Sequence, residues 1–233
     1  MTLQSRLRDV EARLQEACRR SGRNRDDVQV IAVTKYVSTA TAIEAVREGA
    51  DHIGENRWPD AKPKWEALQD QAVFHYIGSL QTNKVKDVVG KFDYIHSLDR
   101  LSLAEAIQHR ASLLGIEVPC FLQVNVSGEQ SKHGLAPDEL APFLREMEPY
   151  DRIKLIGYMT MAPYESEPEA TRPVFRALRQ LRDELNAQAA WKEPIRGLSM
   201  GMSGDFEIAV EEGATHVRLG TVLVGKEDEE GNS

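Results

Sequence analysis

Apolar positions follow two alternating periods along the chain. In the first segment they recur at spacings of three and four residues, which predicts an amphipathic helix through Leu3, Leu7, Val10, Leu14 and Ala17. Residues 28–34, with the sequence VQVIAVT, then form a short β-branched apolar run that is typical of a buried strand. Ser38 or Thr39 can cap the helix that follows, which stops at Gly49.

The same alternation continues along the rest of the chain. Further strands are predicted at His52–Gly54, Val73–Ile77, Tyr94–His96, Pro119–Val126, Lys154–Thr160, Gly197–Met200 and His216–Leu219. Further helices are predicted at Lys62–Leu68, Asn83–Val89, Ser102–Leu114, Asp138–Met147, Glu169–Gln188 and Asp205–Glu212. Eight strands alternating with helices indicate a parallel sheet, which can close into a barrel; an open doubly wound sheet is the competing arrangement. The sequence therefore predicts one α/β domain over residues 1–233, a (β/α)8 TIM-type barrel with an extra N-terminal helix.

Composition and charge exclude several classes of protein. The 29 basic and 37 acidic residues give a net charge of −8, which disfavours nucleic acid and anionic membrane surfaces as partners. No stretch is as long and apolar as a membrane span, and the N-terminal residues contain no signal sequence. Two distant cysteines, Cys18 and Cys120, make a disulfide framework improbable, so we expect a reducing cytoplasm. Residues 226–233 are expected to form a flexible acidic tail.

Lys35 is the first candidate functional residue, because it directly follows the apolar run of the first predicted strand. Functional groups of a parallel barrel lie in the loops that leave the C-terminal ends of the strands. Partial burial there would lower the pKa of a lysine, and Schiff-base formation with an aldehyde requires the neutral amine. The alternative interpretation is a lysine whose stem packs against the barrel while its ammonium group reaches water.

Two pairs of a glycine and a hydroxyl residue follow the last two predicted strands, Ser203-Gly204 and Gly220-Thr221. In barrels of this kind these two loops frequently bind phosphate. Glycine lets backbone N–H groups approach an anion closely, and the hydroxyl groups add donors. Ordinary helix caps and turns would use the same residues.

Arg218 lies within the last predicted strand and shares a face with Gly220. A buried arginine needs a partner, which could be a ring nitrogen of a bound cofactor or a carboxylate in a structural pair. Four histidines, by contrast, show no metal-ligand spacing and are interpreted as core or surface residues: His75, His96, His133 and His216.

Several of these residues together give the chain a resemblance to the pyridoxal-phosphate homeostasis protein family, single-barrel relatives of the N-terminal domain of alanine racemase. The resemblance rests on Lys35, Gly54-Glu55-Asn56, residues 75–84 (HYIGSLQTNK), Ser131-Lys132-His133-Gly134, residues 157–161 (GYMTM), residues 200–203 (MGMS) and residues 218–221 (RLGT). It implies that pyridoxal 5'-phosphate is the cofactor and that Lys35 holds its aldehyde. Ser203, Gly204, Gly220 and Thr221 would bind the phosphate, Arg218 would face the pyridine nitrogen, and Asn56 and Met159 would lie near the ring.

The resemblance also implies a role in intracellular vitamin B6 homeostasis, that is, storage, delivery or buffering of the cofactor, without strong catalysis. An arginine at the ring nitrogen makes the cofactor a weak electron sink. The second domain of related racemases is not expected, because eight residues follow Gly225. Expected partners are the cofactor, pyridoxal 5'-phosphate (PLP), and PLP-dependent apoenzymes, and we expect the protein to be a monomer. A low-activity amino-acid racemase, a cofactor-free Schiff-base aldolase and a regulatory binding module remain alternatives.

Overall fold

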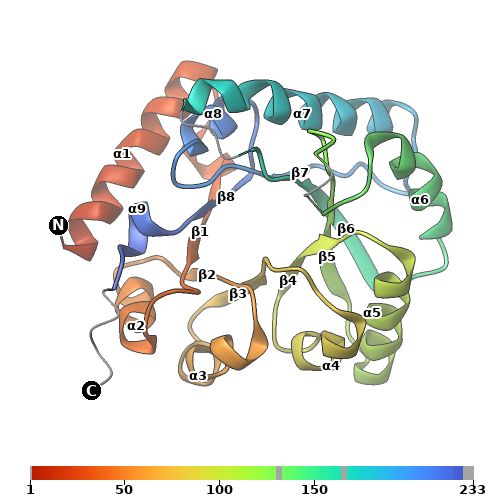
Figure 1. Ribbon diagram of the computed structural model, residues 1–233, viewed down its shortest axis with the longest axis horizontal. Helices are drawn as coiled ribbons and strands as arrows, with labels where there is room; N and C mark the ends of the chain where they lie inside the picture. The colour runs from red at the N-terminus through yellow and green to blue at the C-terminus, as the bar shows by residue number, and fades with distance from the viewer. Residues whose placement is uncertain (1, 130–132, 164–166, 228–233) are drawn as a thin grey trace.

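The computed structural model describes residues 2–129, 133–163 and 167–227. Its eight strands are parallel and pair in chain order into a closed barrel (Figure 1). The strands are β1 (Gln29–Val33), β2 (His52–Glu55), β3 (Val73–Tyr76), β4 (Tyr94–Leu98), β5 (Val118–Gln123), β6 (Ile153–Met159), β7 (Gly197–Ser199) and β8 (His216–Leu219). The barrel closes where β1 pairs with β8, from Gln29 opposite His216 to Ala32 opposite Leu219. The predicted barrel is therefore confirmed, and the open sheet is wrong.

Helices surround the barrel on the outside (Figure 1). They are α1 (Leu3–Ser21), α2 (Thr39–Arg47), α3 (Trp58–Leu68), α4 (Val85–Val88), α5 (Leu101–Leu114), α6 (Leu140–Glu146), α7 (Arg172–Ala187), α8 (Phe206–Glu211) and α9 (Thr221–Val224). Helix α3 begins four residues before its predicted start because Pro59 lies in its first turn, where a missing N–H costs nothing. Helix α9, a single turn, was not predicted. Within the described residues no helix has both the length and the apolar character needed to cross a bilayer.

The inside of the barrel is filled unevenly, with large rings from some strands and glycines from others. A Cβ atom on Gly157 of β6 would lie 2.4 Å from Cε1 of Phe121 on β5, and one on Gly197 of β7 would lie 3.0 Å from the same atom. The Phe121 ring also stacks on His96 of β4, with centroids 4.2 Å apart. The two glycines thus make room for one aromatic ring that fills this side of the interior.

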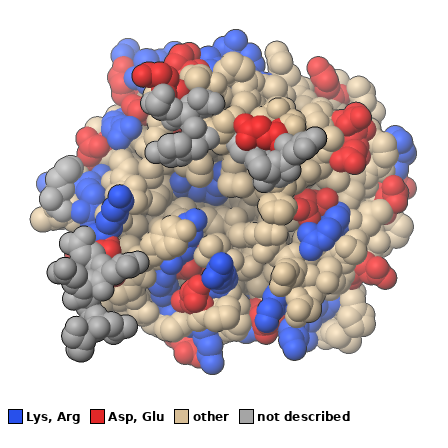
Figure 2. Space-filling view, in the orientation of Figure 1, with Lys and Arg blue, Asp and Glu red and all other residues tan. Residues whose placement is uncertain are grey.

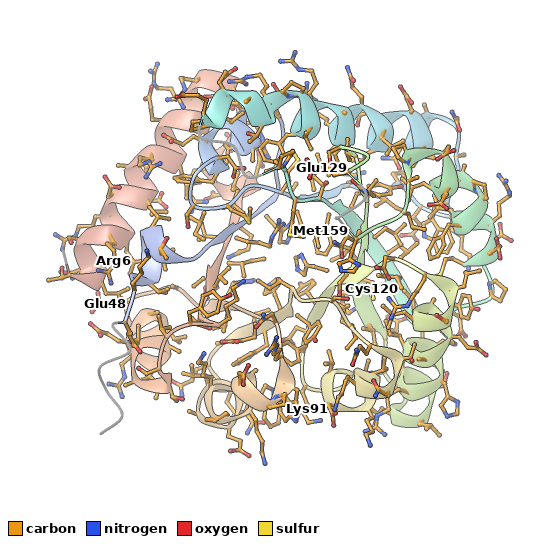
Figure 3. The ribbon with its side chains drawn as sticks, in the orientation of Figure 1. Arg6, Glu48, Lys91, Cys120, Glu129 and Met159 are labelled. Atoms are coloured by element: carbon orange, nitrogen blue, oxygen red, sulfur yellow. The ribbon has the colours of Figure 1, made fainter. Side chains whose placement is uncertain are left out.

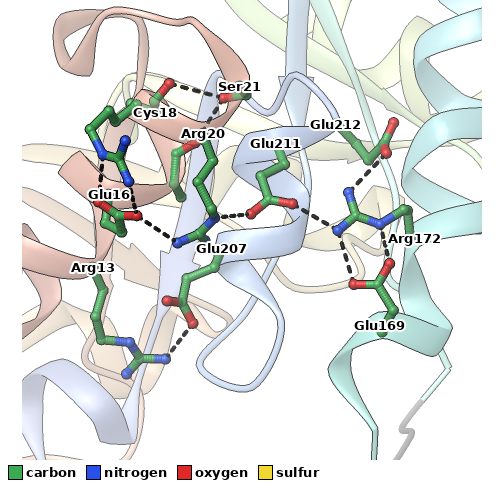
Figure 4. A network of polar contacts seen from close by, with 12 residues as sticks. Arg13, Glu16, Cys18, Arg20, Ser21, Glu169, Arg172, Glu207, Glu211 and Glu212 are labelled. Atoms are coloured by element: carbon green, nitrogen blue, oxygen red, sulfur yellow. Dashed lines mark hydrogen bonds and ion pairs between the residues drawn. The ribbon is translucent and has the colours of Figure 1, made fainter.

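A chain of ion pairs on the outside ties α1, α8 and α7 together (Figure 4). Arg20 of α1 contacts Glu211 at 2.7 Å, and Arg172 of α7 contacts the same carboxylate at 2.7 Å. The side chain of Glu212 is 4% exposed and pairs with three arginines: Arg172, Arg176 and Arg179. These contacts hold α8 from both sides, and so fix the loop that carries Ser203 immediately before it.

Both cysteines are buried and unpaired. Cys120 is completely buried in β5, where burial raises the pKa of its thiol, and it behaves as the small apolar residue expected from the sequence.

Candidate functional site

The predicted site residues follow five neighbouring strands of the barrel. In space the strands run β6, β7, β8, β1 and β2, because β8 closes onto β1. Met159 ends β6, Arg218 lies in β8, and the others follow β7, β8, β1 and β2. Parallel strands place all their carboxyl ends on one face of the barrel. The fold therefore brings the predicted residues to one end of one side of the barrel.

Lys35 lies in a turn two residues beyond the end of β1 and is half-buried. Its Nζ lies 4.8 Å from the centroid of the Tyr36 ring, which is 79% exposed. Within the described residues Lys35 forms no ion pair, so its amine remains available to a ligand. The next helix, α2, is capped by the Ser38 hydroxyl, which accepts the Thr41 N–H at 3.2 Å. The expected cap is confirmed, and it ends the turn that presents Lys35.

A second contact fixes this turn from the far end of the chain. The Glu227 carboxylate accepts the Ser38 N–H and the Ser38 hydroxyl, both at 2.8 Å, and also the Thr41 hydroxyl. Residues 228–233 of the expected acidic tail lie outside the described residues.

The two glycine–hydroxyl pairs lie against each other. The Ser203 hydroxyl accepts the N–H of Gly220 at 3.2 Å, which joins the loop after β7 to the loop after β8. A Cβ atom on Gly204 would meet nothing within 4 Å, and one on Gly220 would meet only Val33, at 3.9 Å. Packing against the protein therefore does not require glycine at either position. Open space beside backbone N–H groups is what a bound phosphate needs, and in this structure the Gly220 N–H is donated to the Ser203 hydroxyl.

Val33 lies between these two loops and Lys35. It is the last residue of β1, it is the residue that a Cβ atom on Gly220 would meet, and Lys35 follows it by two residues. Lys35 and the Gly220-Thr221 loop thus leave the directly paired strands β1 and β8, and the Ser203-Gly204 loop leaves β7, which pairs with β8.

Arg218 is 5% exposed and hydrogen-bonded to neutral groups only. Its Nη1 donates to the Ser199 hydroxyl at 2.6 Å, and its Nη2 donates to the Thr160 carbonyl at 3.0 Å. Burial lowers the pKa of Arg218 to about 10, and the nearby Asp205 carboxylate opposes this shift. Within the described residues Arg218 forms no ion pair, so the alternative of a structural carboxylate pair is not supported.

Asn56 and Met159 flank this arrangement. Asn56 follows β2, and the loop after β3 passes so close that a Cβ atom on Gly78 would lie 2.4 Å from the Asn56 carbonyl oxygen. Met159 is 1% exposed and lies toward the centre of the ring of strands (Figure 3). Ser131 and Lys132, which contributed to the resemblance, lie outside the described residues.

One buried cluster beside Lys35 was not predicted. Lys64 of α3 is 4% exposed, and its Nζ donates to Glu55 Oε1 at 2.8 Å and to the Thr34 carbonyl at 2.6 Å. The Thr34 hydroxyl donates to the same Glu55 oxygen at 2.6 Å, while the buried Glu55 Oε2 has no hydrogen-bond partner within the described residues. This ion pair supports the backbone directly before Lys35. No local pattern in the sequence indicated this ion pair, because Lys64 lies on α3 and its partner Glu55 lies on β2.

The strand histidines form a second unpredicted feature. His52, His75 and His96 lie at neighbouring positions on β2, β3 and β4 and are linked by hydrogen bonds of 2.8 and 2.9 Å. Their separation of 21 to 23 residues, one β/α unit each, was the available sequence signal. Within the described residues no group of histidine, cysteine or carboxylate side chains could hold a metal ion. His133 is exposed, so it is a surface residue and not a core residue.

Charged side chains on the face seen in Figure 2 include Lys and Arg around the hollow at its centre. Basic side chains at this place, on a protein whose net charge is −8, would attract a small anionic ligand.

Comparison with known proteins agrees with this geometry. The family described as the alanine racemase N-terminal domain matches residues 6–228. The pyridoxal phosphate homeostasis protein of Aquifex aeolicus is 44% identical over 222 residues, which are 95% of this chain and 96% of that protein. The protein of the same name from Pseudomonas aeruginosa is 37% identical and covers 97% of this chain and 96% of its own length.

Solved structures give the same result. PipY of Synechococcus elongatus with PLP bound is 34% identical, has a TM-score of 0.82, and covers 96% of this chain and 100% of its own. Alanine racemase of Clostridium difficile, at 16% identity and a TM-score of 0.73, covers 98% of this chain but 57% of its own, and shows the fold alone. By its sequence and its barrel, this chain belongs to the alanine racemase N-terminal domain family and, within it, to the pyridoxal phosphate homeostasis proteins.

Proposed function

We propose that this protein binds pyridoxal 5'-phosphate as a Schiff base on Lys35 and stores, delivers or buffers this cofactor inside the cell. The observation that carries the proposal is the buried Arg218 guanidinium, which forms no ion pair with any described residue, at the same end of the barrel as Lys35 and two open glycine–hydroxyl loops. A buried cation that no carboxylate contacts directly fits a ligand group that accepts hydrogen bonds.

The residues present fit each part of this cofactor. Ser203 and Thr221 offer hydroxyl donors and Gly204 offers a backbone N–H where the phosphate would bind, and the phosphate would replace the Ser203 hydroxyl as acceptor of the Gly220 N–H. Lys35 offers the amine for the aldehyde, and the reaction joins its nitrogen to the aldehyde carbon with release of water. Asn56 and Met159 would border the ring.

Arg218 determines what the bound cofactor can do. The guanidinium stays protonated and has no acceptor atom, so it gives the pyridine nitrogen a hydrogen bond without transferring a full positive charge to the ring. The cofactor itself supplies an electron-withdrawing ring, and this contact keeps that property weak. Such a site is better suited to holding the cofactor than to fast chemistry on amino acids.

The relatives support the same function. Proteins that share 37–44% identity with this chain over nearly its whole length are named for pyridoxal phosphate homeostasis. PipY, at 34% identity, has been solved with PLP bound. We extend the proposal to a cytoplasmic monomer that passes its cofactor to PLP-dependent apoenzymes; light scattering of the purified protein tests the monomer.

Borohydride trapping tests the lysine. The protein incubated with PLP is expected to turn yellow, to lose the colour on reduction, and to gain the cofactor mass on the peptide that contains Lys35. Lys35→Ala should abolish the adduct, whereas Lys154→Ala, a change at an exposed lysine in the second position of β6, should leave it intact. An adduct on another peptide, or no adduct with the natural chain, contradicts the proposal. Colourless protein that cleaves a phosphorylated aldol substrate would favour the aldolase.

Storage is distinguished from catalysis in a separate measurement. The loaded protein should leave the optical rotation of L-alanine unchanged over hours, while an apoenzyme added in stoichiometric amount should gain activity. Fast loss of rotation would favour the racemase.

A further inference from the structure

A continuous line of hydrogen bonds crosses the inside of the barrel and ends at Arg218. Starting from Arg218, Nη1 contacts the Ser199 hydroxyl at 2.6 Å, and the same hydroxyl contacts His96 Nδ1 at 2.9 Å. His96 Nε2 then contacts His75 Nδ1 at 2.9 Å, and His75 Nε2 contacts His52 Nδ1 at 2.8 Å. His52 begins β2, so this line runs from the candidate cofactor site toward the opposite end of the barrel.

The direction of donation can be worked out from the end at Arg218. A guanidinium only donates, so the Ser199 oxygen accepts at that contact. If His96 Nδ1 also donated, the Ser199 hydroxyl hydrogen would have no acceptor within the described residues, in a side chain that is fully buried. An unsatisfied buried donor is costly, so the hydroxyl donates to His96 Nδ1.

This first link fixes the proton on each following ring. His96 accepts at Nδ1 and therefore carries its proton on Nε2, which donates to His75 Nδ1. His75 in turn carries its proton on Nε2 and donates to His52 Nδ1. In this arrangement every donor along the line has an acceptor, and each donates away from Arg218.

The rings must be neutral for the line to hold, because a protonated ring would bring one donor too many. Burial holds the pKa of His75 and His96 well below the usual value for histidine, and the neighbouring His216 and, for His96, the Arg218 charge lower it further. His75 is also stacked on Tyr94 and His96 on Phe121, with centroids 4.6 and 4.2 Å apart, which fixes the planes of the two rings.

We propose that Ser199, His96, His75 and His52 are positioning residues that hold the Arg218 guanidinium through a one-way line of hydrogen bonds, and so aim its remaining N–H groups at the pyridine nitrogen. This inference rests on the proposed function for the contact with the cofactor, but not for the line itself. Successive bonds in such a line polarise one another and strengthen the contact at its end. Arg218 itself has no acceptor atom, so it can only donate, both to the line and to the cofactor.

The line is tested first in the protein without cofactor. Long-range ¹H–¹⁵N spectra of histidine side chains separate protonated from unprotonated ring nitrogens, and they should show His52, His75 and His96 with the proton on Nε2 at neutral pH. Ser199→Ala should change the ring signals of His75 as well as His96, although Ser199 does not touch His75. Ser21→Ala removes a hydroxyl that contacts the Ala17 carbonyl at 2.8 Å on the outer helix α1, away from this line, and should leave both rings unchanged. A proton on Nδ1 of His75 or His96, or a Ser199→Ala effect confined to His96, overturns the proposal.

The second test measures the effect on the cofactor site. Ser199→Ala removes one of the two hydrogen-bond acceptors that hold the Arg218 guanidinium. It should weaken PLP binding roughly tenfold or more and shift the absorption band of the bound cofactor. His52→Leu removes the last acceptor and should shift the band in the same direction, whereas His52→Gln, which can still accept, should restore it. Equal spectra for His52→Leu and the natural chain contradict the positioning role. Absence of any bound cofactor in the natural chain would contradict the proposed function, while the ring signals of the cofactor-free protein would still decide the line.

Discussion

Acid should unfold this protein at a higher pH than its carboxylates alone would require. Burial lowers the pKa of His216 to about 4 and holds the pKa of His75 and His96 well below the usual value. In the unfolded chain each ring titrates near about 6.5. Below that pH the unfolded chain binds protons that the folded protein cannot bind, so the free energy of unfolding falls as the pH falls.

The magnitude follows from proton linkage. Between pH 7 and pH 5, a ring that stays neutral in the folded protein lowers the free energy of unfolding by about 2 kcal/mol. His216 is partly exposed, so we expect about 1.5 kcal/mol for it. The three rings together remove about 5 kcal/mol, which is comparable with the whole stability of many domains. Asp205, whose pKa is raised by burial, takes up its proton at a higher pH in the folded protein than in the unfolded chain, and so opposes this trend.

Urea unfolding followed by circular dichroism at pH 7 and pH 5 measures this loss. His216→Gln should reduce the difference between the two pH values by about 1.5 kcal/mol, whereas His109→Gln, at an exposed position of α5, should leave it unchanged. If the free energy of unfolding is the same at both pH values, or if His216→Gln does not change the difference, the account of buried neutral rings is refuted.

Three further predictions concern packing around the site, and each is checked by urea unfolding. Lys64→Met should destabilise the fold by about 3–5 kcal/mol, because it leaves the Glu55 carboxylate buried without a counter-charge. The double variant Lys64→Met, Glu55→Leu should recover much of this loss. If it recovers none, the stabilising ion pair is contradicted. Gly157→Ala should cost at least about 1–3 kcal/mol, because its methyl group would overlap the Phe121 ring. Gly204→Ala should change stability by less than about 0.5 kcal/mol, since space is open there, yet weaken phosphate-dependent PLP binding; unchanged binding would remove Gly204 from the phosphate site.

The barrel and the residues at its mouth could be predicted because their signals are local. Strands such as Gln29–Val33 are short apolar runs, and the residues just after them are placed by the architecture. The position of Lys35 relative to Gly220 followed from barrel closure, which pairs the first strand with the last.

The supporting contacts could not be predicted in the same way, because they join distant elements. Lys64 is a charged residue on a helix with prolines at two positions, and nothing in its neighbourhood shows that its amine is buried. His75 and His96 carried a signal in their repeated position within the β/α unit, but Ser199, the hydroxyl partner of His96, lies 103 residues away from it. Whether a histidine is part of a line or merely buried depends on the side chains that face it across the barrel.

Helix α2 has no acidic residue in its own first turn and takes its N-terminal carboxylate from Glu227. The turn that presents Lys35 is therefore held by hydrogen bonds to Glu227, which lies 189 positions after Ser38 in the sequence. Removing the Glu227 carboxylate would leave the Ser38 N–H at the start of α2 without its acceptor and would loosen the turn that ends in this helix.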